Sequence, residues 1–404
     1  MKKFLCFALF LFSVLTINAQ QPYVLLVSFD GFRWDYLNRN ITPTFDSIKQ
    51  IGVKALSLQP SFPSKTFPNH YTIVTGMYPE HHGIISNFFK NRVTGDIYKL
   101  SSKEAVQNSQ WYDGEAFWQT AEKNNIKTAS YFWPGSEVDL NYRHPSYFEE
   151  YEHERDYSMR IDGVINWLRL PYDQRPHFIT LYFDAADTYG HRYGPNSNEL
   201  NETIKKLDKI VSEISGKLKS IEMQDSVNLI IVSDHGMTET SPDKTINIEE
   251  FINEYVYELD GDGPVVMIQP ETKFKDSVYS ILKRNENHYK VYKKNEMPGY
   301  YHFSEHPFIY DIIVIADVGW SLIKNSMLEK INNYFRGGNH GYDNHHLDMH
   351  GIFVATGPAI KSNYTTGTIR NIDIYPLLCR IFSITPRSTI DGEIEKIEFI
   401  LKIE

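Results

Sequence analysis

The sequence predicts an α/β fold with a largely parallel central sheet, helices on both faces and inserted loops. Three short apolar runs, at Tyr23–Phe29, 177–183 and 228–233, are rich in β-branched and aromatic residues and are typical of buried strands. Between the last two runs, residues 199–219 place apolar side chains at three- and four-residue steps, as an amphipathic helix does. Alternation of strands and helices is typical of layered α/β folds.

Local signals predict further helices beside these strands. One helix is expected to start after Thr42 as N-cap, with Pro43 in its first position, and to stop at Gly52. Asp113 is a candidate N-cap for another helix that runs through Ala121. Both helices are expected to cover the sheet.

The organisation of the chain favours one domain over several. No internal repeat and no Pro/Ser-rich linker interrupts residues 20–404, so these residues are expected to form a single domain. Two aromatic-rich stretches near 85–112 and 285–310 have weak periodicity and are candidates for the inserted loops.

Composition and net charge limit the kinds of binding partner that are expected. The 404 residues are 41% hydrophobic and 23% charged, which is ordinary for a globular protein. The net charge is -10, and no basic stripe offsets it, so no long nucleic acid is expected as a partner. Small anionic substrates remain compatible with this charge, because a bound metal ion can reverse the local sign.

The first 19 residues have the pattern of a secretory signal peptide. Lys2 and Lys3 precede an apolar run at residues 4–15, and Ala19 stands at a plausible cleavage point. The run is shorter than the roughly 20 residues needed to cross a bilayer, so no stable membrane span is expected. The mature chain is therefore expected to be secreted or periplasmic, with Cys379 as its one cysteine and no intrachain disulfide.

Carboxylates follow the predicted strands. Asp30 and Asp234 come directly after the first and third runs, and Asp187 lies shortly after the second. Because the carboxyl ends of parallel strands face one crevice, these three side chains are expected to converge. Three histidines are candidates to join them: His191, His235 and His340. An isolated Asp–His pair is more typical of a turn, but several such pairs at strand ends indicate a binding site for divalent metal ions. Zn²⁺ is the favoured ion, with Mn²⁺ or Fe as alternatives.

A hydroxyl in the segment Ser61-Phe-Pro-Ser-Lys-Thr-Phe-Pro-Asn-His-Tyr is the candidate nucleophile. Pro68 marks an expected helix start, and a hydroxyl just before it feels the positive end of the helix dipole. A neighbouring metal would help to convert that hydroxyl into an alkoxide. The alternative is that Ser64 or Thr66 is a simple N-cap.

Further segments stand in a characteristic order. They are Val-Ser-Phe-Asp-Gly-Phe-Arg from Val27, Tyr-Phe-Trp-Pro-Gly-Ser from Tyr131, Asp-His-Gly-Met from Asp234 and His-Gly-Tyr-Asp-Asn from His340. Together with the nucleophile segment they resemble the nucleotide pyrophosphatase/phosphodiesterase family of the alkaline phosphatase superfamily, over essentially the whole mature chain. The resemblance implies an alkaline-phosphatase-like fold and a single phosphodiesterase catalytic domain at 20–404.

The same resemblance implies the roles of the site residues. Two Zn²⁺ ions are expected as cofactors. The resemblance also implies that Thr66 is the nucleophile and not a simple N-cap. One zinc would be held by Asp187, His191 and His340, and the other by Asp30, Asp234, His235 and the Thr66 oxygen. Asn87 matches the family's oxyanion-stabilising asparagine, and Phe67 and Tyr182 match the aromatic positions that hold the nucleobase.

The implied activity is hydrolysis of nucleotide phosphodiester or pyrophosphate bonds through a phosphothreonine intermediate, with release of nucleoside monophosphates. Small-molecule nucleotides are the expected substrates. A phospholipid or choline-ester phosphodiesterase on the same metal site is the nearest alternative. A phosphomonoesterase is less favoured, because no arginine clamp or third metal site is recognisable. A non-catalytic metal-binding protein is disfavoured, since binding alone needs no nucleophile.

Four histidines crowd the late segment, and their flanks distinguish them. His340 is expected in a glycine-rich turn from Gly337 to Gly341, where small residues permit close backbone approach. His350 leads into an apolar run at 351–356 and is expected either to support a metal ligand or to have a structural role. The other two, His345 and His346, are expected in a solvated loop.

Overall fold

An eight-stranded sheet forms the centre of the protein. The computed structural model describes residues 21–140, 143–331 and 335–402, so the predicted signal peptide at 1–19 lies outside the described residues. One strand, β18, runs antiparallel to both of its neighbours, and every other neighbouring pair in this sheet is parallel. The spatial order is β19 (Tyr364–Thr366), β2 (Val53–Ala55), β18 (Phe353–Thr356), β9 (Val227–Val232), β1 (Tyr23–Phe29), β8 (Phe178–Phe183), β6 (Thr128–Tyr131) and β7 (Tyr147–Glu149). The predicted α/β fold with a largely parallel sheet is confirmed.

The three predicted strands are adjacent in the middle of this sheet. The strand β1 has the predicted bounds and lies between β8 and β9, whose bounds differ from the prediction by one residue. Along β1, Leu25 and Val27 enter one apolar core and Val24 and Leu26 enter the other. Burial on both faces explains why each run is continuously apolar instead of alternating with polar residues.

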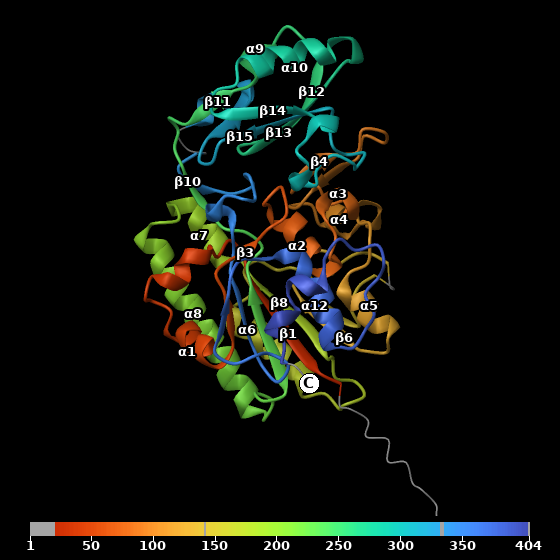
Figure 1. Ribbon diagram of the computed structural model, residues 1–404, viewed down its shortest axis with the longest axis vertical. Coiled ribbons are helices and arrows are strands. Elements are labelled where there is room, and N and C mark those ends of the chain that lie inside the picture. Colours follow the sequence, from red (N-terminus) through yellow and green to blue (C-terminus); the bar gives the residue numbers. More distant parts are fainter. Residues whose placement is uncertain (1–20, 141–142, 332–334, 403–404) are drawn as a thin grey trace, which may run out of the picture.

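Helices cover both faces of the sheet, as predicted (Figure 1). One layer consists of α1 (Pro43–Ile51), α6 (Tyr157–Leu168) and α8 (Asn198–Ser220). The other consists of α2 (Thr66–Thr75), α5 (Phe117–Lys123) and α12 (Ile374–Ile381).

The helix α1 has the predicted bounds, but its N-terminus is satisfied differently. Thr42 stands at the N-cap position without making a side-chain capping bond. Instead Asp208 of α8 accepts hydrogen bonds from the backbone amides of Thr44 and Phe45, at 3.1 and 3.0 Å, and from the Thr44 hydroxyl at 2.8 Å. A carboxylate beside the first turn satisfies free N–H groups and complements the helix dipole, so α8 fixes the start of α1.

Two other helix starts differ from the sequence expectation. The helix α5 begins at Phe117, three residues later than a cap at Asp113 requires, because Gln119 Oε1 accepts from the Ala116 amide at 2.9 Å and fixes the first turn. The helix α2 begins at Thr66, two residues before Pro68. Proline is tolerated there because first-turn amides have no partner within the helix.

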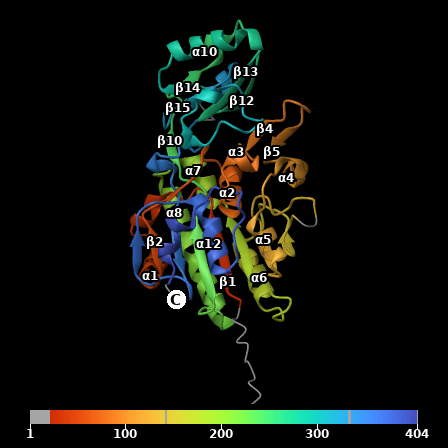
Figure 2. The ribbon, with the colours of Figure 1, turned by 45° about the vertical axis from the view of Figure 1, so that its right-hand side comes forward.

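A smaller lobe stands at one end of the molecule, beyond α2 and α7 (Ala185–Tyr193), in both Figure 1 and Figure 2. Its antiparallel sheet has the order β12 (Tyr257–Asp262), β13 (Val265–Pro270), β15 (Ile312–Ala316) and β14 (Tyr289–Lys293), packed against α9 (Glu249–Ile252) and α10 (Lys275–Arg284). The predicted insertion at 285–310 is therefore only part of a longer one. The stretch 85–112 contains a hairpin of β4 (Phe88–Lys90) and β5 (Ile97–Lys99), followed by α4 (Lys103–Gln107).

Short elements complete the described fold. A two-residue parallel pair joins β3 (Leu58–Gln59) to β20 (Ile369–Arg370), and α3 (Pro79–His82) follows α2. Two further pairs are β10 (Thr238–Thr240) with β17 (Gly337–Asn339), and β11 (Thr245–Asn247) with β16 (Ser321–Ile323). The glycines expected in a turn before His340 thus lie in a strand.

Candidate active site

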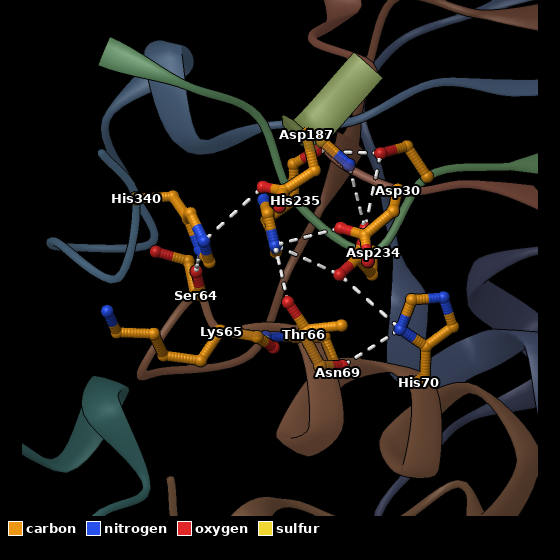
Figure 3. Close-up of polar contacts among 12 residues, drawn as sticks. Asp30, Ser64, Lys65, Thr66, Asn69, His70, Asp187, Asp234, His235 and His340 are labelled. Carbon is orange, nitrogen blue, oxygen red and sulfur yellow. Dashed lines mark hydrogen bonds and ion pairs between the residues drawn. The ribbon is translucent and has the colours of Figure 1, made fainter. Parts of the chain in front are cut away.

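The predicted metal ligands converge at the carboxyl ends of the central strands. Asp30 follows β1, and Asp234 and His235 follow β9. The first two turns of α7, which follows β8, carry Asp187 and His191, and the residue after β17 is His340. Figure 3 shows the labelled members of this set directed toward one another above the start of α2: Asp30, Asp187, Asp234, His235 and His340. The expected convergence is therefore present.

Two glycines permit this close approach. Gly31 has φ +67°, and a Cβ there would lie 2.8 Å from the Asp187 Cα, so glycine lets the end of β1 meet α7. At Gly337 a Cβ would lie 2.1 Å from the carbonyl oxygen of His191. The glycines before His340 thus allow β17 to lie against the backbone of α7, which brings His340 beside His191.

The first cluster consists of Asp187, His191 and His340. The Nε2 atoms of the two histidines lie 3.1 Å apart, and Asp187 Oδ1 lies 3.3 Å from His191 Nε2 and 3.5 Å from His340 Nε2. Zinc bonds of about 2.0–2.2 Å in a tetrahedron put neighbouring ligand atoms about 3.3–3.6 Å apart. The observed separations fit a shared divalent ion.

The second cluster joins two carboxylates, one imidazole and the Thr66 hydroxyl. His235 Nε2 lies 3.0 Å from Asp234 Oδ2, 3.3 Å from Asp30 Oδ1 and 3.3 Å from Thr66 Oγ1. The His235 ring also stacks on that of His340, with centroids 3.5 Å apart. The two clusters are therefore adjacent, which is the arrangement of a two-metal site.

The hydrogen bonds of the histidines direct their lone pairs into the clusters. In each ring Nδ1 donates to a backbone carbonyl at 2.8 Å: His191 to Gly338, His235 to Gly236 and His340 to Ser64. Nε2 is then the unprotonated atom that faces the carboxylates. In these clusters three buried carboxylate oxygens have no hydrogen-bond partner among the residues that the structure describes: Asp30 Oδ1, Asp187 Oδ1 and Asp234 Oδ2. Unpaired oxygens opposite imidazole lone pairs fit divalent cations.

Charge crowding shifts the pKa values in the site. Burial raises the pKa of Asp30 well above its ordinary value, and the charges of Asp234 and Asp187 add to the effect. Burial opposes ionisation of Asp234 too, but His235 and His70 outweigh it and lower its pKa to about 2. Burial and the nearby charge of His235 keep the pKa of His340 well below its ordinary value, so this ring is neutral and suited to bind a metal.

The start of α2 presents the candidate nucleophile. Thr66 is the first residue of the helix, after the extended residue Lys65, so its hydroxyl lies at the positive end of the dipole. The next amide, that of Phe67, donates to Asn87 Oδ1 at 3.0 Å. This bond holds Asn87 beside Thr66 and leaves the Asn87 amide nitrogen as the group that can donate to an oxyanion.

A cavity of about 590 Å³ extends from these residues. Its lining includes Thr66 and Asn87 at the site, and otherwise several apolar and aromatic side chains: Phe67, Leu100, Val106, Phe132, Trp133, Tyr151 and Tyr182. Tyr151 is 47% exposed, whereas Tyr182 is 8% exposed. The Tyr182 hydroxyl donates to Asp30 Oδ2 at 2.5 Å, which connects this ring to the second cluster as well as to the cavity.

Comparison with known proteins identifies the family. Residues 24–343 match the family model described as type I phosphodiesterase / nucleotide pyrophosphatase. The chain belongs to this family. It is 36% identical over 370 residues to bis(5'-adenosyl)-triphosphatase enpp4 of Xenopus laevis, a match that covers 91% of this chain and 79% of the relative. It is 34% identical over 383 residues to human ectonucleotide pyrophosphatase/phosphodiesterase family member 5, covering 95% and 79%.

Solved structures agree with this assignment. The structure of murine ectonucleotide pyrophosphatase/phosphodiesterase 5 superposes with a TM-score of 0.88 at 32% identity, covering 94% of this chain and 100% of that chain. Human family member 1 is a longer relative, of which the match covers 40%. The chain is thus a nucleotide pyrophosphatase/phosphodiesterase with the α/β fold of that family.

His70 of this phosphodiesterase site was not predicted from the sequence. His70 is fully buried; its Nδ1 donates to the Thr66 carbonyl at 2.9 Å and lies 3.4 Å from Asp234 Oδ2. Its Nε2 accepts from the Ser28 hydroxyl at 2.8 Å. His70 therefore connects β1, the nucleophile helix and a metal-site carboxylate. Its place four residues after Thr66 in a helix is the one signal in the sequence that could have found it.

The remaining late histidines of the phosphodiesterase lie outside the clusters. His350 is buried, with Nδ1 at 2.8 Å from the Ser57 hydroxyl and Nε2 at 3.1 Å from the Asn344 carbonyl. Both ring nitrogens thus have partners within the fold, as expected for a side chain with a structural role. His345 and His346 are exposed, as expected for a solvated loop.

Proposed function

We propose that this phosphodiesterase cleaves nucleotide phosphodiester and pyrophosphate bonds through a phosphothreonine on Thr66 and releases nucleoside monophosphates. The observation that carries the proposal is the position of the Thr66 hydroxyl, which lies 3.3 Å from His235 Nε2 of the second cluster and lines the aromatic cavity. A nucleophile, a charge-stabilising site and a flat apolar pocket are thus contiguous.

Two Zn²⁺ ions are proposed as the cofactors. Asp187, His191 and His340 would hold one ion, and Asp30, Asp234, His235 and the Thr66 oxygen would hold the other. The mixture of imidazole and carboxylate donors without thiolate suits zinc. Bound zinc would supply Lewis-acid charge to the phosphoryl oxygens and favour ionisation of the hydroxyls that attack.

The chain's own residues perform the remaining tasks. In the first step the Thr66 oxygen forms a bond to phosphorus, its proton leaves to solvent or base, and the bond from phosphorus to the leaving oxygen breaks. In the second step water adds to the phosphorus and gives up a proton, the Thr66–phosphorus bond breaks, the Thr66 oxygen takes up a proton, and the nucleoside monophosphate departs. The Asn87 amide nitrogen donates to a non-bridging oxygen, and His70 holds the Thr66 backbone in position.

The cavity is proposed to bind the nucleoside. Phe67 and Tyr151 contribute partly exposed rings to its wall, and Tyr182 closes the end next to Asp30. Stacking of a base on an aromatic face stabilises binding by roughly 1–3 kcal/mol. One solved relative is an inactive threonine-to-alanine variant of murine family member 5 in complex with AMP, which supports both the nucleotide and the threonine.

The place of action is proposed to be outside the cytoplasm. Several relatives are named ectonucleotide pyrophosphatases, and the sequence predicts a signal peptide at 1–19 followed by a secreted or periplasmic mature protein. Within the described parts of the chain, no helix has both the length and the apolar character needed to cross a membrane.

Parallel assays on the zinc-loaded protein test the proposal. The substrates are a chromogenic aryl ester of a nucleoside monophosphate, diadenosine triphosphate, a nucleoside triphosphate and glycerophosphocholine. We expect turnover of the nucleotides, loss of turnover with a chelator, and recovery when zinc returns. Turnover of glycerophosphocholine with none of the nucleotides would overturn the nucleotide assignment in favour of a choline-ester phosphodiesterase.

A further inference from the structure

The side-chain amide of Asn69 fixes the loop at residues 61–65 to the first turns of α2. Asn69 is fully buried. Its Nδ2 donates to the carbonyls of Pro63 and Lys65 at 3.0 and 2.9 Å, and its Oδ1 accepts from the Ser61 amide at 2.7 Å. These three bonds hold the loop at both of its ends and in its middle.

Asn371 completes the network around this amide. It begins the short 3₁₀ helix η8 (Asn371–Asp373) and is buried. Its Nδ2 donates to Asn69 Oδ1 at 2.8 Å, and its Oδ1 accepts from the Ser61 hydroxyl at 3.2 Å. The Asn69 amide therefore donates two hydrogen bonds and accepts two, which is its full capacity. A buried network whose members are all satisfied is rigid, so the loop has one defined position.

Ser64 lies in this loop and contacts the segment that carries His340. Its carbonyl accepts from His340 Nδ1 at 2.8 Å. Its hydroxyl donates to the Tyr342 carbonyl at 2.9 Å and accepts from the Gly341 amide at 3.2 Å. Figure 3 shows Ser64 next to His340, with Thr66 two residues later at the start of α2. One short loop thus joins the candidate nucleophile to a member of the first cluster.

We propose that Asn69 and Ser64 are positioning residues, which set the Thr66 oxygen relative to the first cluster during the reaction. The inference rests on the proposed function and adds two residues to it. Attack on phosphorus requires a close and aligned approach, and a misplacement of about 1 Å can cost about 100-fold in rate. Neither side chain lines the nucleoside cavity, so removing them should slow the chemical steps and leave nucleotide binding unchanged.

The two side chains act on different parts of the site. Asn69 holds the carbonyl of Lys65, the residue directly before Thr66, so its loss should displace the nucleophile. The Ser64 hydroxyl holds the backbone next to His340, so its loss should displace that ring. Asn69→Ala is therefore expected to slow attack more than Ser64→Ala does, and Ser64→Ala is expected also to weaken zinc binding.

The test is a single-turnover reaction of the zinc-loaded protein, in saturating excess, with the p-nitrophenyl ester of AMP. The rate constant for p-nitrophenol release then measures the first step and does not depend on the fraction of active protein. We expect it to fall by roughly 10- to 100-fold in Asn69→Ala and by roughly 10-fold in Ser64→Ala. The protein concentration that gives the half-maximal rate should stay within about twofold of wild type.

Zinc release gives a readout that does not depend on activity. Ser64→Ala should lose one zinc to a chelator about 10-fold faster than wild type, because the backbone partner of His340 is held less firmly. Chelator is added to the loaded protein, and the metal that remains bound is measured over time.

Asn228→Ala is the matched control for these measurements. Asn228 is an equally buried asparagine near the start of β9, at the end of the strand opposite to the site. Its side chain donates to the Tyr23 carbonyl at 3.1 Å and accepts from the Ala359 amide at 2.8 Å. The control should lose stability, because the same kind of buried contact is broken, yet keep the wild-type rate constant and zinc release.

Circular dichroism and thermal unfolding show whether each variant is folded. A wild-type rate constant in either folded variant, an equal loss in Asn228→Ala, or wild-type zinc release in Ser64→Ala overturns the positioning role and leaves the proposed function intact. If Asn69→Ala does not fold, Ser64→Ala decides the question by itself. Absence of p-nitrophenol release by the zinc-loaded wild type overturns the proposed function itself.

Discussion

The Tyr182 hydroxyl donates a 2.5 Å hydrogen bond to Asp30 Oδ2, while Asp30 Oδ1 is left without a partner and faces His235 Nε2 at 3.3 Å. One oxygen of the carboxylate is therefore fixed by tyrosine, and the other is available to a metal. Partners of this kind orient a metal ligand, and their removal costs roughly 10- to 100-fold in metal affinity or activity.

Tyr182→Phe is predicted to weaken zinc binding by roughly 10-fold, because it removes this bond but keeps the ring. KM for a nucleotide substrate should change little once zinc is saturating. Chelator titrations followed by metal analysis measure the first effect, and steady-state kinetics the second. Unaltered zinc affinity with a raised KM would instead assign Tyr182 to the nucleobase.

The partly exposed rings of the cavity are predicted to act on the nucleobase. Phe67→Ala and Tyr151→Ala should each weaken a nucleotide substrate by roughly 1–3 kcal/mol, because a stacking face is lost. A base-free aryl phosphodiester with the same leaving group should be affected much less. Kinetics on the two substrates check this, and equal losses on both would show that these rings only support the fold.

Thr66→Ala is predicted to abolish almost all turnover, by at least about a thousandfold, because no other hydroxyl of the start of α2 replaces the attacking oxygen. Zinc should still bind, since six imidazole and carboxylate ligands remain. Single-turnover assays with radiolabelled nucleotide should trap phosphate on the wild-type protein and not on the variant. A near-normal rate in a variant of verified zinc content would exclude the covalent route.

Acid stability should depend on His350. Burial lowers its pKa to about 4, against about 6.5 in an unfolded chain. The folded state therefore binds fewer protons between these values, so stability is full above pH 6.5 and falls as pH drops toward 4, by about 3 kcal/mol for this group. Urea unfolding at pH 7.5 and pH 4.5 should show a smaller difference for His350→Gln than for wild type. His345→Gln, at an exposed position, is the control and should keep the wild-type difference.

Helix bounds and strand ends are predicted well where local sequence signals mark them. The proline at the first position and the glycine after the last fix the bounds of α1, and the acidic residues after β1 and β9 reveal where the strands end. The capping of the same helix by Asp208 was not predictable, because it comes from α8, more than 160 positions away. Local chemistry therefore defines the element, and tertiary contact decides how its end is satisfied.

Some site residues can likewise be predicted from sequence motifs, and others are placed by tertiary contacts. The six Asp and His side chains of the two clusters stand in motifs whose spacing is visible in the chain. His70 and Tyr151 show no such pattern, and their positions depend on what folds against them: Asp234 and the cavity wall. Tyr182 occupies a buried strand, and only the structure shows that its hydroxyl reaches Asp30.

The late histidines provide the sharpest test of the metal assignment. His340 Nε2 lies 3.1 Å from His191 Nε2 and 3.5 Å from Asp187 Oδ1, and its Nδ1 is fixed by the Ser64 carbonyl. Removing this ring leaves two protein ligands at that position, too few for a stable zinc site. We therefore predict that His340→Ala lowers zinc content by about one ion per chain and reduces activity severely, by more than about a hundredfold.

The other three histidines supply matched controls for the same experiment. His345→Ala and His346→Ala remove exposed rings and should stay close to wild type in zinc content and activity. His350→Ala breaks contacts with Ser57 and the Asn344 carbonyl, so it should lose stability and some activity yet retain both ions. Metal analysis of the four purified variants, together with their thermal unfolding, shows which of these histidines binds zinc. Loss of a zinc from His350→Ala, with two ions kept in His340→Ala, would show that the ligand set is assigned to the wrong histidine.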